Sequence, residues 1–255
     1  CCFNTVEDAG RCISAIIAKP LIPSSCELMD SVSINAVNKA RGNPLPDCGA
    51  LCIVEVDGET DEIIDRDIAI VEEIAKEIGA VEVIPTKDKK LMAQWTDARK
   101  SVMTSLSALK PGYACVSLAD DMGVSVSLVP KAVKAFQEIA EKYDVTIATY
   151  GHASDGNLHT KMVIDVYDKD QWERGVKAVD EIFDVCIELG GTVTGEHGVG
   201  ISKAPNFQKE RASEMSSIRA IKKAMDPENI LNPGKLDQWE GGILRNLRYP
   251  CPDFM

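Results

Sequence analysis

The chain has 255 residues, enough for one large domain or two small ones, and 45% of them are hydrophobic and 27% charged. This balance is typical of a globular protein and excludes a disordered chain. The formal net charge of −12 argues against nucleic-acid binding, which requires a basic surface. No apolar run reaches the roughly 18–20 residues of a membrane-spanning helix, so we expect no transmembrane segment.

The cysteines and the start of the chain indicate a cytoplasmic protein whose sequence begins within a longer chain. The chain opens with Cys1-Cys2-Phe3, without a signal peptide or an initiator Met, so we expect a fragment whose N-terminal part is missing. The nine cysteines lie mostly in apolar runs and are odd in number. They are typical of reduced core thiols in a cytoplasmic protein and argue against a disulfide framework. Cys48 and Cys52 have a C-x3-C spacing, but no second pair completes a zinc site.

The first half of the chain predicts alternating helices and strands. We expect helices over 6–18, 31–41 and 89–109 and strands over 49–57, 80–85, 113–118 and 124–128. A further helix carries an apolar stripe from Ile64 to Ile78 and ends at Gly79. Pro130 opens the helix that closes this half.

The second half continues the alternation and supplies the best indication of topology. We expect strands over 145–150, 160–166 and 192–194, a helix over 171–189 and helical segments within 202–225. Asp155-Gly156 joins two strands too tightly for a parallel crossover and indicates a hairpin. The pattern predicts an α+β fold with a largely antiparallel sheet and helices packed on one side.

Two histidines flank this hairpin. If Asp155 and Gly156 are the turn residues, His152 and His159 are direct cross-strand neighbours with Cβ atoms about 4.5–5.5 Å apart. A longer loop would shift the pairing but would still let both rings reach one point. The alternative is a pair of hydrogen-bonded histidines without a metal.

A third group strengthens the metal interpretation. Glu196 and His197 lie in a glycine-rich stretch, residues 195–200, where glycines permit tight turns. An acidic loop or a phosphate-cradling turn is the alternative, although Glu196 would repel phosphate. Two imidazoles and one carboxylate suit catalytic Zn²⁺ or a two-histidine-one-carboxylate Fe²⁺ site, which makes His152, His159 and Glu196 the candidate metal ligands.

Three motifs in order resemble those of the FAD-linked oxidase family with the vanillyl-alcohol oxidase/p-cresol methylhydroxylase fold. They are GHASDGNLH at 151–159, GGTVTGEHGVG at 190–200 and DPENILNPGK at 226–235. The stretch WTDAR at 95–99 is similar to the glycolate oxidase D subunit and D-lactate dehydrogenase branch. The resemblance implies that residues 1–225 form the substrate (cap) domain. It also implies that 226–255 return toward an FAD-binding domain, which this chain lacks.

The resemblance further assigns roles to individual residues. It implies that His152, His159 and Glu196 bind a divalent metal (Zn, Fe or Mn), that His197 is the catalytic base and that Arg99 binds the substrate carboxylate. An i,i+4 ion pair within a helix is the alternative for Arg99. It implies that Gly198 and Asn232 contact the FAD, which is held mainly by the missing domain. An electron-transfer flavoprotein or an iron–sulfur subunit is the implied protein partner.

The expected function is that of the C-terminal domain of a metal- and FAD-dependent dehydrogenase or oxidase of a 2-hydroxy acid, inactive as an isolated fragment. In relatives that act on 2-hydroxyglutarate, a Thr and a Lys stand where our alignment puts Met103 and Ala119. This difference favours a small substrate such as D-lactate or glycolate. A metal-dependent hydrolase, a non-catalytic metal-binding subunit and another branch of the same fold, such as the ether-lipid synthases, remain alternatives.

Overall fold

The computed structural model describes residues 1–236. The strands are β1 (Cys2–Phe3), β2 (Ser25–Asp30), β3 (Ala50–Glu55), β4 (Ala114–Val116), β5 (Met122–Gly123), β6 (Thr146–His152) and β7 (Asn157–Ile164). The helices are α1 (Val6–Ile17), α2 (Ser31–Arg41), α3 (Asp61–Ile78), α4 (Lys89–Lys100), α5 (Val102–Ser107), η1 (a 3₁₀ turn, Val126–Leu128), α6 (Val129–Lys142), α7 (Lys169–Glu188), α8 (Ala204–Glu210) and α9 (Met215–Met225). None of these helices is long and apolar enough to cross a membrane.

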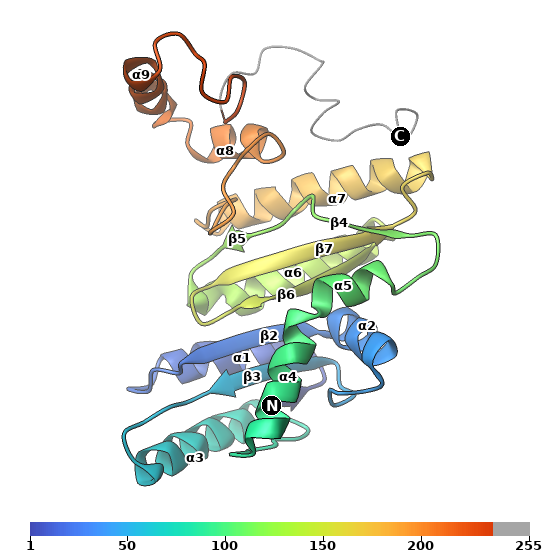
Figure 1. Ribbon diagram of the computed structural model, residues 1–255, viewed down its shortest axis with the longest axis vertical. Coiled ribbons are helices and arrows are strands. Elements are labelled where there is room, and N and C mark those ends of the chain that lie inside the picture. Colours follow the sequence, from blue (N-terminus) through green and yellow to red (C-terminus); the bar gives the residue numbers. More distant parts are fainter. Residues whose placement is uncertain (237–255) are drawn as a thin grey trace.

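The strands form one twisted sheet in the order β1-β3-β2-β6-β7-β4, and the short β5 pairs with the start of β7 (Figure 1). Every pairing is antiparallel. The predicted α+β class with an antiparallel sheet is therefore confirmed. The β6–β7 hairpin lies in the interior of the sheet, between β2 and β4, and its side chains enter the cores on both faces.

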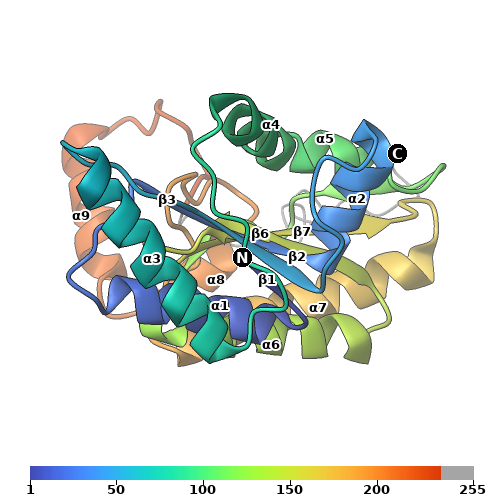
Figure 2. The same cartoon turned by 90° about the horizontal axis from the view of Figure 1, so that it is seen from below.

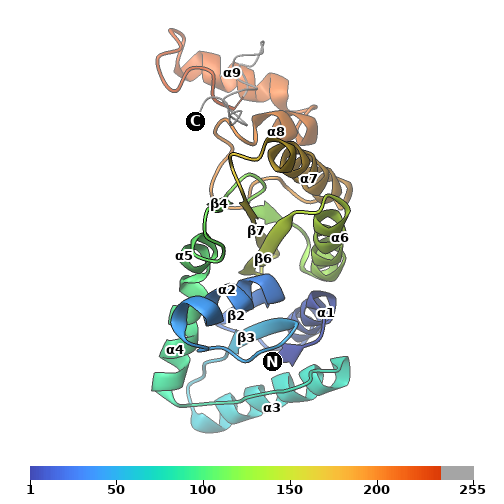
Figure 3. The same ribbon diagram turned by 90° about the vertical axis from the view of Figure 1, so that its right-hand side faces the viewer.

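Helices cover both faces of the sheet, which corrects the expectation that they pack on one side. α1, α3, α6 and α7 bury the larger core on one face (Figure 2). On the other face α2, α4 and α5 close a smaller core around Met29, Leu51 and Tyr150 (Figure 3). Strand residues alternate between the two cores, as Leu28 and Met29 do, because successive side chains of a strand point to opposite faces.

Several predicted elements agree closely with the structure because local signals define their ends. Thr60 caps α3 through its side chain, which accepts a hydrogen bond from the Ile63 N–H, and Gly79 ends the helix with φ 102°. The predicted helix over 89–109 is instead two helices, α4 and α5, which are interrupted at Ser101. There the Ser101 hydroxyl donates to the Ala98 carbonyl (2.8 Å).

Other predicted strands are reduced or replaced. The segment 80–85 forms one bridge, between Glu82 and Cys2, and 192–194 forms one bridge, between Thr192 and Gly123. The predicted strand at 124–128 is wrong, because residues 126–128 form the 3₁₀ turn η1. β2 was not predicted, although it pairs along its length with β3 and in part with β6. Short segments of this kind depend on their neighbours for hydrogen bonds, so periodicity alone does not define them.

The hairpin register also differs from the two-residue turn that we expected. His152 pairs with Asn157 and Tyr150 pairs with His159, which leaves a four-residue loop, 153–156. Gly156 has φ 80°, but Asp155 is not among the residues with positive φ, so the type I′ turn does not form. Residues 150 and 152 point to the same face of β6, so His152 and His159 are diagonal neighbours on one face.

Candidate metal centre and catalytic site

The candidate site lies on the sheet face that carries the smaller core. His152 ends β6 and His159 lies on β7, while Glu196 and His197 belong to the glycine loop, which we define as residues 195–200, after α7. Arg99 is in the last turn of α4, above Tyr150 of β6. Segments from four parts of the chain therefore meet at one end of the hairpin.

The structure brings together the three residues that the sequence predicted as metal ligands. One potential ligand atom from each of His152, His159 and Glu196 lies within 4.8 Å of the others. The two histidine rings are 5.8 Å apart in an edge-on arrangement, and His159 Nε2 is 3.6 Å from Glu196 Oε1. His159 is buried, whereas the Glu196 side chain is 50% exposed, so the group opens to solvent on the side of the glycine loop.

Each of these histidines is oriented by a second carboxylate. His152 Nδ1 lies 2.7 Å from Glu27 Oε1, and His159 Nδ1 lies 3.1 Å from Asp120 Oδ1. A ring whose Nδ1–H donates to a carboxylate keeps the lone pair of Nε2 for a metal, which is the usual arrangement around metal-binding histidines. The donor set therefore fits a divalent cation, and Glu27 and Asp120 are site residues that the sequence did not reveal.

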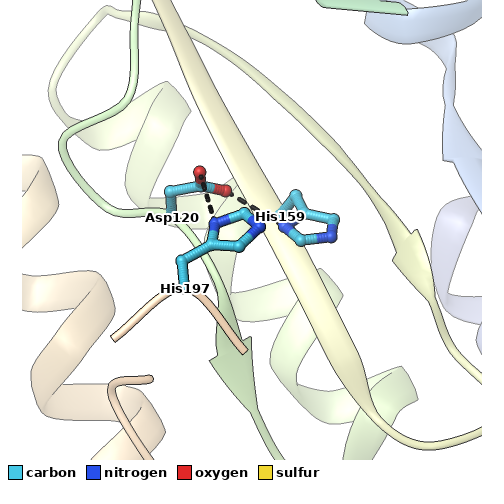
Figure 4. Close-up of side chains that lie close together, drawn as sticks. All are labelled: Asp120, His159 and His197. Carbon is cyan, nitrogen blue, oxygen red and sulfur yellow. Dashed lines mark hydrogen bonds and ion pairs between the residues drawn. The ribbon is translucent and has the colours of Figure 1, made fainter. Parts of the chain in front are cut away.

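His197 contacts the same group (Figure 4). Its ring stacks on that of His159 with centroids 5.3 Å apart, its Nδ1 is 3.4 Å from Asp120 Oδ2, and its Nε2 is 3.2 Å from Glu196 Oε1. Two further sets could also hold a cation, Asp120 with His159 and His197, and Asp121 with Glu196 and His197. The assignment of His197 as base and Glu196 as ligand stays a prediction.

Asp120 is the carboxylate on which this side of the site converges. It contacts both His159 and His197, and it also pairs with the ammonium group of Lys161. Burial raises the pKa of Asp120, but hydrogen bonds from His159 and Lys161 outweigh burial and hold the pKa at about 2. Lys161 is itself buried and donates to Ser117 Oγ (2.8 Å), so it compensates the Asp120 charge inside the protein.

Arg99 pairs across the fold and not along its own helix. Its Nε donates to Glu27 Oε2 (2.9 Å), and its guanidinium lies 4.8 Å from the centre of the Tyr150 ring. Glu27 thus holds Arg99 with one oxygen and His152 with the other. The alternative of an i,i+4 ion pair is not what the structure shows, and the proposed contact of Arg99 with a substrate carboxylate stays a prediction.

The two predicted flavin contacts lie on adjoining segments. Gly198 is exposed with φ 82°, and a Cβ atom there would meet no atom within 4 Å, so its contact with FAD stays a prediction. Asn232 lies in an exposed turn with φ 48°. The Leu236 N–H donates to the Gly200 carbonyl (3.0 Å), which ties this turn to the glycine loop. Residues 237–255, the rest of the predicted returning segment, lie outside the described residues.

Comparisons with known proteins identify the family of this chain. A sequence profile described as "FAD linked oxidases, C-terminal domain" matches residues 1–236. The chain belongs to the FAD-linked oxidase family and carries its C-terminal domain. The resemblance inferred from the three motifs is thereby confirmed.

Individual relatives within this family include glycolate oxidase subunits and a D-lactate dehydrogenase. The chain is 39% identical to the glycolate oxidase subunit GlcD of Bacillus subtilis over 92% of this chain and 49% of that protein. It is 30% identical to GlcD of Escherichia coli K12 (91% and 46%) and 27% identical to the D-lactate dehydrogenase of Archaeoglobus fulgidus (92% and 50%). The chain spans about half the length of the curated relatives it matches.

Solved structures share the fold. The 4-ethylphenol oxidase from Gulosibacter chungangensis matches with a TM-score of 0.61 and 14% identity over 93% of this chain and 52% of that chain. p-Cresol methylhydroxylase matches with a TM-score of 0.61 and 15% identity over 92% of this chain and 51% of that chain. At these identities the likeness supports the fold alone, and it agrees with the fold family expected from the motifs.

Proposed function

We propose that this chain is the substrate-binding domain of a metal- and FAD-dependent dehydrogenase or oxidase of a small 2-hydroxy acid, D-lactate or glycolate. The observation that carries the proposal is the pair of histidines whose Nδ1 atoms are held by Glu27 and Asp120 while the group converges on Glu196. The glycolate oxidase and D-lactate dehydrogenase relatives supply the substrate class.

The chemistry divides between the bound groups and the side chains. The metal supplies a Lewis acid that lowers the pKa of a substrate hydroxyl, and the FAD supplies the hydride acceptor. His152, His159 and Glu196 hold the metal. His197, whose Nδ1 faces Asp120 and whose Nε2 lies beside Glu196, accepts the hydroxyl proton. Arg99 binds the substrate carboxylate through its guanidinium group. Because this group also pairs with Glu27, the substrate carboxylate and Glu27 compete for it.

The size of the substrate is proposed from two positions. Met103 is half exposed and Ala119 is buried in the larger core, and neither side chain has the hydroxyl or ammonium group that the Thr and the Lys of 2-hydroxyglutarate-type relatives would supply. Both positions therefore support a small monocarboxylate.

The remaining parts of the enzyme lie on other polypeptide segments. We infer that an FAD-binding domain precedes Cys1, because the relatives are about twice as long, and that residues 226–255 return toward it from the cap domain, residues 1–225. An electron-transfer flavoprotein or an iron–sulfur subunit takes the electrons, and the protein works in the cytoplasm. We expect the 255-residue chain alone to purify colourless and not to oxidise either acid. Stoichiometric FAD on this chain would contradict the division into domains.

The test uses the FAD-containing full-length protein with D-lactate and glycolate, followed by stopped-flow flavin absorbance with metal content measured in parallel. Glu196→Gln removes a charged ligand and should lower both metal content and activity. His197→Ala should keep the metal while the rate of flavin reduction falls by about 10²–10⁴-fold. Arg99→Met should mainly raise KM, because carboxylate binding is lost in the ground and transition states alike.

Three results would overturn the proposal. If His197→Ala removes the metal while Glu196→Gln retains it, the roles assigned to these adjacent residues are reversed. If the 255-residue chain hydrolyses a substrate without any flavin, the site is that of a metal-dependent hydrolase. A metal-free protein with an intact fold would instead indicate a non-catalytic subunit.

A further inference from the structure

The backbone of the glycine loop is hydrogen-bonded to one buried carboxylate, that of Asp121. The Glu196 N–H donates to Asp121 Oδ1 (2.7 Å), and the His197 N–H donates to Asp121 Oδ2 (2.8 Å). The Gly195 N–H donates to the Asp121 backbone carbonyl (2.8 Å), and the Thr194 hydroxyl donates to Oδ2 (3.1 Å). Four consecutive residues, 194–197, are therefore fixed to a single residue of the β4–β5 connection.

Asp121 is itself rigidly placed. It is fully buried, its Oδ2 accepts from the Lys203 ammonium group (2.9 Å) and its Oδ1 accepts from the side-chain amide of Asn157 at the start of β7 (3.3 Å). Its backbone adopts φ 68°, a conformation that non-glycine residues rarely take and that the surrounding contacts must support. Asn157 is two residues from His159, so Asp121 links the glycine loop to the strand that carries the other half of the site.

We propose that Asp121 is the positioning residue that fixes Glu196 and His197 relative to His152 and His159. Its neighbour Asp120 orients imidazole rings directly, whereas Asp121 acts through the backbone of the glycine loop. The Glu196 and His197 side chains are each half exposed, and the backbone N–H groups of both residues donate to Asp121, so the placement of both side chains depends on this carboxylate. The role in metal binding rests on the proposed function, but the placement of the loop does not.

The first test measures Zn²⁺ affinity of the 255-residue chain by calorimetry in Asp121→Asn. Asparagine keeps the size and tolerates the left-handed conformation, so the substitution isolates the loss of the carboxylate. We expect affinity to fall by about 10–100-fold, as when a partner of a metal ligand is removed. The matched control is Asp30→Asn, because Asp30 is also buried and accepts backbone N–H bonds, from Ser33 and Thr149, without contacting the glycine loop.

A second variant separates positioning from stability. Asp121→Asn leaves the Lys203 ammonium group buried without its partner, which destabilises the fold by itself. The double variant Asp121→Asn/Lys203→Met removes both charges and should recover stability while Zn²⁺ affinity stays low. Full recovery of affinity in the double variant, or an equal loss of affinity in Asp30→Asn, would show that Asp121 contributes stability only and would overturn the proposal.

The decisive readout needs no metal. Hydrogen exchange of the Glu196 and His197 amides should be at least tenfold faster in Asp121→Asn than in the wild type, and unchanged in Asp30→Asn. Unchanged exchange at these two amides in Asp121→Asn would overturn the inference. If the wild type binds no Zn²⁺ but the two amides lose protection as expected, the metal part of the proposed function fails while the positioning role of Asp121 holds.

Discussion

The two faces of the sheet are built from different chemistry. The face under α1, α3, α6 and α7 is closed by large apolar side chains, among them Phe136 and Phe183, which are fully buried. The opposite face, under α2, α4 and α5, has the smaller core, and at the hairpin end this core gives way to charged side chains such as Glu27 and Asp120. One sheet thus carries a stabilising face and a site face.

The difference shows that one face stabilises the fold by apolar burial, whereas the other face carries charged groups that a functional site requires. Apolar burial is favourable wherever it occurs, and a polar group buried in the larger core without a partner would be costly. Carboxylates that are buried or partly buried on the site face require partners, as Asp120 has Lys161 and Glu27 has Arg99. Substitutions on the two faces should therefore affect different measurable quantities.

The largest expected effect is on the stabilising face. Phe136→Ala removes a fully buried ring between α6 and the sheet, and we expect a loss of about 3–5 kcal/mol in the free energy of unfolding. Zn²⁺ affinity at temperatures where the variant is folded should not change. Urea denaturation and calorimetry check the two parts. A weaker metal site in this variant would show that the faces are coupled and would break the comparison.

A second effect concerns pH and Asp30, the side-chain cap of α2 on the site side. Burial raises the pKa of Asp30 to about 6 despite hydrogen bonds from Ser33 and Thr149. Between pH 4 and 6 the folded state holds a proton that the unfolded state has lost, so this group makes stability fall as pH rises. The stability of the wild type relative to Asp30→Asn should decrease by roughly 2 kcal/mol from pH 4 to 7. A flat difference across this range, measured by denaturation at each pH, would contradict the assigned shift.

A third effect lies on the site face and is visible mainly in metal affinity. Glu27→Gln keeps an oxygen near His152 but loses the charge that pairs with Arg99. We expect Zn²⁺ affinity to fall by about tenfold, toward the low end for a partner of a metal ligand. The loss of stability should be smaller than for Phe136→Ala. Unchanged affinity would mean that His152 is not oriented by Glu27, and it would weaken the assignment of His152 as a ligand.

The smallest effect is expected on the outer surface of the stabilising face. Lys134 of α6 and Glu7 of α1 form an ion pair at 3.2 Å, and both side chains are about half exposed. Lys134→Met should change the free energy of unfolding by about 0–1 kcal/mol, because exposed pairs are solvated and screened. A larger loss in denaturation at ordinary ionic strength would show that charges also stabilise this face.

Local patterns in the sequence determined a large part of this fold. The apolar stripe from Ile64 to Ile78 and its stop at Gly79 define α3 because period and caps are properties of the segment itself. The hairpin and the co-location of His152 with His159 on one face likewise followed from a short stretch. Three motifs, each contiguous in the chain, were sufficient to indicate the family.

Only the tertiary structure decided the register of the hairpin and the partners of the site residues. The loop between β6 and β7 has four residues because Asp155 does not adopt the positive φ of a tighter turn. Glu27 reaches His152 across 125 residues of sequence and Asp120 reaches His159 across 39, since β2 and β4 flank the hairpin in the sheet. Periodicity records which face a side chain takes, but which carboxylate lies beside it depends on strand order, and strand order is settled by packing of the whole sheet.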